Sequence, residues 1–234
     1  MKPRVYLDAA LEQPGDVSLN DAPAHHLARV LRLREGDALT VFNGRGGEWD
    51  AQFVGKRRVR LVAFDAVERE SPLRITLVQG VSSGDRMDYT VQKAVELGVA
   101  AIQPLLTKRG VVRLEGARAS ARVDHWRKIA IAACEQCGRN RIPEVLPLID
   151  FHQYRPLPDV TRLLLSAQGE SIREVKMEDA ATIAAGPEAG FAPEEQAALE
   201  RAGFVKASLG PRVLRTETAA LAALAALNAL QGDF

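Results

Sequence analysis

Residues 71–107, SPLRITLVQGVSSGDRMDYTVQKAVELGVAAIQPLLT, decide the fold class of this chain. Leu73 to Gln79 and Ala101 to Thr107 are apolar runs of strand length, and Arg86 to Leu97 between them has the apolar spacing of an amphipathic helix. A strand, a helix and a second strand in this order indicate two parallel strands joined by a helical crossover. The stretch therefore predicts an α/β domain.

The same alternation continues toward the C-terminus. Further strands are predicted at Arg162–Ala167, Thr182–Ala185 and Phe204–Leu209, and further helices at Arg118–Cys137, Pro193–Ala202 and Glu217–Leu230. We expect one α/β domain over residues 71–234, because no linker or repeat interrupts the pattern.

The chain before Ser71 has a different pattern. Short β-rich runs are predicted as strands at Val5–Leu7, Ala38–Phe42, Trp49–Val54 and Val59–Phe64. Residues 43–47, Asn-Gly-Arg-Gly-Gly, suit a hairpin turn, and His26–Leu33 has helical spacing. Residues 1–70 are therefore expected to form a small barrel-like β domain.

Composition excludes several classes of protein. The 234 residues carry a net charge of +1, which is unlike a general nucleic-acid coat protein. Charged residues near the N-terminus argue against a signal peptide, and the apolar run Thr218–Leu230 is too short to cross a membrane. Cys134 and Cys137 form a C-x-x-C pattern without a second ligand pair. We therefore expect a cytoplasmic protein with no membrane span and no metal site.

Three late strands are each predicted to end in a glycine-containing turn. These turns are Leu165-Ser166-Ala167-Gln168-Gly169-Glu170, Ala185-Gly186-Pro187-Glu188-Ala189-Gly190-Phe191 and Ser208-Leu209-Gly210-Pro211-Arg212. Ligands of open α/β sheets bind at the carboxyl ends of strands, where small residues let the backbone approach closely. The chain lacks the glycine-rich dinucleotide and P-loop motifs and the nucleophile elbow. The turns therefore predict a different kind of pocket, built largely of backbone.

Several motifs resemble one family in sequence and in order. They are Gly84-Asp85-Arg86-Met87-Asp88, Gln92-Lys93-Ala94-Val95-Glu96-Leu97-Gly98, Trp126-Arg127-Lys128-Ile129-Ala130, Glu135-Gln136-Cys137-Gly138-Arg139, Gly186-Pro187-Glu188-Ala189-Gly190-Phe191 and Leu209-Gly210-Pro211-Arg212-Val213-Leu214-Arg215-Thr216-Glu217-Thr218-Ala219. Together they resemble the RsmE family, bacterial 16S ribosomal RNA (uracil-N3) methyltransferases of the SPOUT superfamily. The family usually has glycine where this chain has Ala189, so we do not expect a close ligand contact there.

The resemblance implies a fold, a cofactor and a substrate. It implies a PUA-like N-terminal barrel, a C-terminal SPOUT domain with a trefoil knot, and a homodimer. It also implies S-adenosylmethionine as methyl donor and the uridine numbered 1498 in 16S rRNA, within the small ribosomal subunit, as acceptor. The expected cofactor-binding residues are Leu165, Ser166, Ala167, Gly186, Pro187, Glu188, Gly190, Ser208, Leu209, Gly210, Val213, Leu214, Arg215 and Thr218.

Methyl transfer to uracil N3 requires that the imide lose its proton. A guanidinium near the uracil oxygens would stabilise the anion, and a carboxylate could accept the proton. Arg139 and Arg215 are candidates for the first role, and Glu135 and Glu188 for the second. Alternatively, Arg139 contacts phosphate and Glu188 accepts hydrogen bonds from loop backbone. Thr216 is expected to cap the last helix.

Basic residues are concentrated between Lys108 and Arg141, where nine stand against three acidic residues. The residues expected to contact RNA are Arg29, Arg32, Arg58, Arg86, Arg109, Arg113, Arg139 and Arg141. Two other functions stay open at this point. They are methylation of a ribose 2′-hydroxyl by a SPOUT enzyme, and RNA binding in ribosome assembly without catalysis.

Overall fold

The computed structural model describes residues 2–55, 57–158 and 160–234, apart from the side chain of Ala22. The chain divides into two compact units. Unit 1 takes in the residues up to Glu70 together with Cys134–Ile142, and unit 2 takes in Ser71–Ala133 and Pro143–Phe234. The segment Cys134–Ile142 thus lies in unit 1, although the sequence boundary placed it in the C-terminal domain.

Unit 1 is built on a five-stranded sheet. In spatial order its strands are β1 (Arg4–Tyr6), β3 (Ala38–Phe42), β4 (Glu48–Phe53), β5 (Arg58–Asp65) and β2 (Gly15–Ser18). β1 pairs with β3 in parallel, and the other neighbours are antiparallel. The four strands expected from sequence are confirmed to within a residue or two at their ends, and β2 is an addition.

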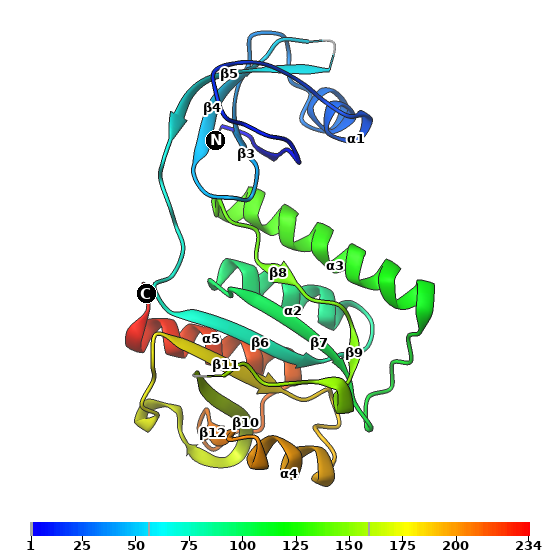
Figure 1. Ribbon diagram of the computed structural model, residues 1–234, viewed down its shortest axis with the longest axis vertical. Coiled ribbons are helices and arrows are strands. Elements are labelled where there is room, and N and C mark those ends of the chain that lie inside the picture. Colours follow the sequence, from blue (N-terminus) through cyan, green and yellow to red (C-terminus); the bar gives the residue numbers. More distant parts are fainter. Residues whose placement is uncertain (1, 56, 159) are drawn as a thin grey trace. The chain divides into compact units, whose positions relative to one another are not determined.

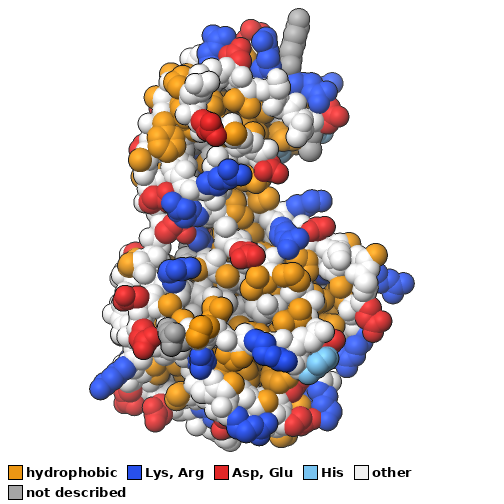
Figure 2. Space-filling view, in the orientation of Figure 1, with side chains coloured by type: hydrophobic (Ala, Val, Ile, Leu, Met, Phe, Trp, Pro, Cys, Tyr) orange, Lys and Arg blue, Asp and Glu red, His pale blue; other side chains and the backbone are white. Residues whose placement is uncertain are grey.

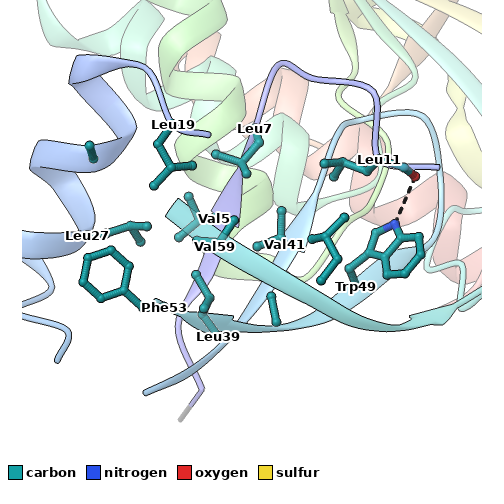
Figure 3. Packing of buried hydrophobic residues seen from close by; sticks show 13 residues of the cluster. Val5, Leu7, Leu11, Leu19, Leu27, Leu39, Val41, Trp49, Phe53 and Val59 are labelled. Atoms are coloured by element: carbon teal, nitrogen blue, oxygen red, sulfur yellow. Dashed lines mark hydrogen bonds between the residues drawn. The ribbon is translucent and has the colours of Figure 1, made fainter. Parts of the chain in front are cut away.

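The core of unit 1 follows from the alternation of its strands. In β4, Trp49, Ala51 and Phe53 are buried while the residues between them are more exposed. Figure 3 shows these inward side chains packed with Leu27 and with residues of the other strands. The Trp49 indole N–H donates to the carbonyl of Leu11 at 3.1 Å, so the buried ring keeps its polar group satisfied.

The helical segment of unit 1 differs from the expectation. A single helix over His26–Leu33 is wrong, because α1 (Asp21–His25) is followed by a π-helical turn at His26–Val30. Arg32 then takes a φ of 55°, which an α-helix cannot accommodate. The apolar spacing located a helical segment but not its type.

Unit 2 contains a parallel sheet with strand order β12-β10-β11-β6-β7-β8, in which β9 also pairs with β7. Its strands are β6 (Arg74–Gly80), β7 (Ala101–Leu106), β8 (Glu144–Val145), β9 (Ile149–Asp150), β10 (Thr161–Ser171), β11 (Ala180–Ala185) and β12 (Val205–Ser208). The five strands predicted here are confirmed, and so is the parallel α/β class.

Helices lie on both faces of this sheet (Figure 1). They are α2 (Asp85–Glu96), α3 (Gly116–Cys137), α4 (Pro193–Arg201) and α5 (Thr216–Gln231), all within two residues of the predicted bounds. α5 contacts β6, β11 and α2, whereas α4 contacts β10. Leu199 of α4 belongs to the buried cluster that contains Val78 and Leu164. Among the helices that the structure describes, none is both long and apolar enough to span a membrane.

Strand β10 does not end at the first predicted glycine turn. It runs on to Ser171, and its register against β12 shifts between Leu165 and Glu170, so that both residues pair with Ala207. Gly169 lies in this irregularity, where an added Cβ would stand 2.5 Å from the Ala207 backbone nitrogen. The glycine therefore permits two strands to approach closely and does not terminate one.

Candidate functional site

The irregular middle of β10 and the loop after β12 line a cavity of about 120 Å³. Its lining includes seven residues expected to bind a cofactor, namely Leu165, Ser166, Ala167, Leu209, Gly210, Val213 and Leu214. A second cavity, of about 580 Å³, shares Leu209, Gly210 and Arg212 with the first. Two cavities thus adjoin the loop after β12, which agrees with a backbone-rich ligand site.

The loop after β11 is shaped by a turn. The Gly190 backbone N–H donates to the Pro187 carbonyl at 2.8 Å, and Gly190 has a φ of +68°. Ala189 is exposed and is not among the described non-glycine residues with positive φ, which are Arg32 and Arg57. The turn therefore needs glycine at 190, and alanine at 189 is tolerated without strain.

Two glycines allow close packing around the loop after β11. A Cβ on Gly80, the last residue of β6, would lie 2.5 Å from the Pro187 ring. A Cβ on Gly186 would lie 2.8 Å from the Phe191 backbone nitrogen. Neither glycine has a positive φ, so the space and not the backbone conformation requires them. Gly80 was not among the residues that the sequence singled out.

Gln79 joins the loop after β11 to the last helix, α5. Its Nε2 donates to the Gly186 carbonyl at 3.3 Å and to the Thr216 hydroxyl at 3.0 Å, and that hydroxyl donates to Gly186. Thr216 was expected to cap the last helix, but it is the first residue of α5, and Arg215 occupies the N-cap position. Gln79 is fully buried, and its Oε1 has no partner among the described residues. Gln79 was not predicted as a site residue, because its signal in the sequence is an uncharged polar residue in an apolar strand.

Glu188 is held by three donors. Its Oε1 accepts the Ser83 N–H at 2.9 Å, the Ser83 hydroxyl at 2.8 Å and the Arg86 guanidinium at 3.0 Å. Burial alone would raise the pKa of Glu188, but the hydrogen bonds from Ser83 and Arg86 outweigh it and hold the pKa below its ordinary value. A carboxylate kept ionised in this way fixes the loop to the start of α2 and is a weak proton acceptor.

Arg215 and Thr218 follow the pocket loop at the start of α5, and both are exposed. The Arg215 carbonyl accepts the Ala219 N–H at 2.8 Å, which fixes its backbone. Within the described ranges, its guanidinium makes no hydrogen bond or salt bridge. Arg215 therefore presents a cation to solvent beside the residues that line the cavity.

Arg139 and Glu135 lie in unit 1, away in the chain from these loops. The Arg139 guanidinium forms a two-pronged contact with the Glu70 carboxylate, and only 4% of Arg139 is exposed. Glu135 accepts the Tyr6 N–H at 2.9 Å, and burial raises the pKa of its carboxyl. Both side chains are therefore used inside unit 1.

The whole segment from Glu135 to Arg141 is bound to the rest of unit 1 by hydrogen bonds. Arg4 donates to the carbonyl of Gly138 and to Asn140 Oδ1, at 3.1 and 2.7 Å, and Asn140 donates to the Val67 carbonyl at 2.8 Å. We call residues 134–142 the clasp segment. Its hydrogen bonds explain why it clusters with unit 1.

Glu48 supports the clasp segment through the arginines that it binds. It accepts hydrogen bonds from Arg69, at 2.9 Å, and from Arg4, and both arginines also donate to the Gly138 carbonyl. Burial alone would raise the pKa of Glu48, but these hydrogen bonds lower it from 4.5 to about 2. The carboxylate thus favours folding when it is ionised.

This lowered pKa predicts an acid-dependent loss of stability. A folded pKa below the unfolded one contributes stability above about pH 4.5 that is lost as the pH falls toward 2. The contribution is about 3 kcal/mol at neutral pH. Urea unfolding at several pH values measures it. The Glu48→Gln variant should lose part of the decline between pH 4.5 and 2, and a decline as steep as that of the parent protein would contradict the assignment.

The eight arginines expected to contact RNA fall into two groups. Arg58, Arg86, Arg113, Arg139 and Arg141 are bound to carboxylates or carbonyls of the protein itself. Arg29, Arg32 and Arg109 are exposed and have no hydrogen bond or salt bridge in the part of the chain that the structure describes. On the face drawn in Figure 2, basic and acidic side chains are interspersed. The guanidinium groups of the second group are therefore more available for phosphate contacts.

The residues around the loops fit S-adenosylmethionine. Apolar Leu165, Leu209 and Leu214 suit a purine ring, and the backbone of Ser166 and Gly210 in the same lining provides polar groups. No group of three His, Cys, Asp or Glu residues that could hold a metal occurs among the described residues.

Comparisons with known proteins identify the class. A family model described as RNA methyltransferase domain matches residues 69–228, and one described as RNA methyltransferase PUA domain matches residues 19–64. The chain is therefore an RNA methyltransferase with a PUA domain.

Individual relatives narrow the class to one family. Ribosomal RNA small subunit methyltransferase E of Buchnera aphidicola is 33% identical over 99% of this chain and 95% of its own. The crystal structure of the same enzyme from Neisseria gonorrhoeae, bound to S-adenosyl methionine, is 40% identical over all of both chains, with a TM-score of 0.92. A Legionella pneumophila methyltransferase with bound cofactor is 38% identical over the full lengths, with a TM-score of 0.95. The chain belongs to the ribosomal RNA small subunit methyltransferase E (RsmE) family.

Proposed function

We propose that this protein transfers the methyl group of S-adenosylmethionine to N3 of the uridine numbered 1498 in 16S rRNA. The observation that carries the proposal is the cavity lined by residues 165–167 of β10 and by the loop after β12, in a chain that shares its full length with a cofactor-bound RsmE enzyme. The cofactor supplies an electrophilic methyl group on a sulfonium.

The loops bind and orient the cofactor in this proposal. Gln79 and Thr216 hold the Gly186 carbonyl, while Glu188 fixes the far side of the same loop to α2. The turn at Pro187–Gly190 keeps the backbone close to the ligand. These contacts are made within the protein itself and hold the loop in one position, so little ordering is needed on binding. We therefore assign Glu188 a positioning role and no part in proton transfer.

Arg215 is our candidate for stabilising the uracil anion. It follows the cavity loop directly, is exposed and makes no salt bridge among the described residues. A guanidinium placed at the uracil oxygens favours the deprotonated imide, which is the form that reacts. Arg139, the other candidate, is occupied by Glu70, so we propose a structural role for it together with Glu135.

Replacement of Arg215 tests this assignment. Arg215→Ala should lower kcat for RNA methylation by about a hundredfold, since loss of one fixed donor to a developing anion has effects of this order. S-adenosylmethionine affinity and the melting temperature should change little. Arg201→Ala, which removes an exposed arginine in the last turn of α4, is the matched control. Equal kcat in the two variants would contradict the role of Arg215.

We extend the proposal to the assembly and fold that the family implies. Residues 1–70 act as a PUA-like RNA-binding domain and residues 71–234 as a SPOUT domain with a trefoil knot. The family matches support the PUA and methyltransferase domains, and the resemblance implies the knot. Arg29, Arg32 and Arg109 contact phosphates of the small ribosomal subunit. The protein acts in the cytoplasm, because ribosomes are its substrate, and as the homodimer that the family resemblance implies. Sedimentation of the full chain tests the dimer, and a monomer at micromolar concentration would contradict it.

The function itself is tested with small ribosomal subunits from cells that lack this methylation. Incubation with S-adenosylmethionine labelled in its methyl group should place the label in 16S rRNA. Saturable cofactor binding without transfer of label would favour the RNA-binding alternative.

A further inference from the structure

A separate cavity of about 600 Å³ lies at the carboxyl end of β7. Its walls come from the loop after β7, from the start of α3 and from the segment around β9. It shares no lining residue with the two cavities beside the β12 loop. Its volume is within the range of sites that enclose small organic ligands, so it can hold a group of nucleoside size.

The cavity combines apolar walls with an unused polar group. Leu114, Leu148 and Ala119 form apolar surface. Thr107 lines the same cavity, is 5% exposed, and its hydroxyl oxygen has no partner among the described residues. A buried hydroxyl without a partner carries an energetic cost unless a ligand or water satisfies it. The lining thus suits a planar group that can form hydrogen bonds.

The charged residues of the cavity are largely committed to the protein. Lys108 pairs with Glu194, and the Arg113 guanidinium donates to the Gly110 and Val112 carbonyls. Acidic Glu115 and Asp150 also line the cavity. A mixed lining of this kind does not select a free anion. It favours an uncharged heterocycle, while the exposed Arg109 in the same loop is available to a phosphate.

Glu195 connects this cavity to the proposed cofactor loop. It is 5% exposed, and its two carboxylate oxygens accept the Lys108 N–H at 2.8 Å and the Ala192 N–H at 2.7 Å. Ala192 directly follows the segment Gly186–Phe191. One buried carboxylate therefore fixes the loop after β7 to the end of the loop after β11.

We propose that the cavity at β7 receives one nucleoside of the RNA substrate, with its base against the apolar wall and its edge at the Thr107 hydroxyl. This inference rests on the proposed function and adds to it the place where RNA enters unit 2. Glu195 then keeps the nucleoside site and the cofactor loop in a fixed relation.

Photocrosslinking tests the proposal with the full chain. The probe is a 16S rRNA fragment that contains 4-thiouridine in place of uridine. Crosslinked peptides identified by mass spectrometry should include residues 106–119 or 148–153. Crosslinks found only in other segments would overturn the proposal, whether or not the protein transfers methyl groups.

Variants then separate this site from the cofactor site. Ala119→Trp should fill the cavity and lower both the crosslink yield and kcat/KM for RNA at least tenfold, with cofactor affinity unchanged within twofold. Ala121→Trp, on the same helix but outside the lining, is the matched control. Thr107→Val keeps the side-chain shape and should raise KM for RNA several-fold. Unchanged crosslinking in Ala119→Trp would overturn the nucleoside site while leaving the proposed function intact.

Discussion

Gly186→Ala is expected to weaken S-adenosylmethionine binding at least tenfold, as measured by calorimetry. The added Cβ would stand 2.8 Å from the Phe191 nitrogen and 2.9 Å from two backbone atoms of Gly190. Backbone atoms cannot rotate away as a flexible side chain can, so the loop itself must shift. The shift would also disturb the Gly186 carbonyl, which accepts hydrogen bonds from Gln79 and Thr216. A tenfold loss corresponds to about 1.4 kcal/mol of binding free energy.

The matched control for this loop is Ala189→Gly. Ala189 is exposed and is not a described positive-φ position, so restoring the family's glycine should change cofactor affinity less than twofold. Wild-type affinity in Gly186→Ala would show that the loop is not part of the cofactor site. A large gain in Ala189→Gly would show that the alanine has a direct cost in binding.

Arg139→Ala is expected to destabilise unit 1 by about 2–4 kcal/mol. The substitution leaves the partly buried Glu70 carboxylate without its two-pronged partner, and removal of one member of a buried ion pair has a large cost. For a protein of this size the melting temperature should fall by roughly 5–10 °C. Differential scanning calorimetry measures this change.

Arg141→Ala tests whether the destabilisation expected for Arg139→Ala comes from the burial of its ion pair or only from the loss of a positive charge. Arg141 also pairs with a glutamate, Glu68, but the two side chains are 55% and 37% exposed. An exposed pair contributes about 0–1 kcal/mol, so this variant should melt close to the parent protein. If Arg139→Ala instead melts normally and loses kcat a hundredfold, the catalytic role considered from the sequence would be favoured over the structural one.

Local patterns in the sequence predicted most of unit 2. The strand and helix periodicities between Leu73 and Leu230 gave the elements, and their alternation gave the parallel sheet. The exception was β10, which continues past Ala167 because it pairs again with Ala207 after its irregularity. Pairing between segments so far apart in the chain leaves no local pattern.

The candidate site was predicted only in part, because its contacts also join segments that are far apart in the chain. The glycine turns of Leu165–Glu170 and Ser208–Arg212 indicated residues that do line one cavity. The role of Gln79 could not be predicted, because it depends on Gly186 and Thr216, more than a hundred residues later. The pairing of Arg139 with Glu70 was equally hidden, since motif similarity does not show what a side chain contacts.

Mass spectrometry of nucleosides from treated 16S rRNA tests whether this protein methylates uracil N3. Small ribosomal subunits that lack the methylation are incubated with the protein and S-adenosylmethionine, and the RNA is digested and sequenced by fragment mass. We expect one added methyl group, on the base N3 of the uridine numbered 1498. A methyl group on ribose, or RNA that stays unmodified while the cofactor binds, would contradict it.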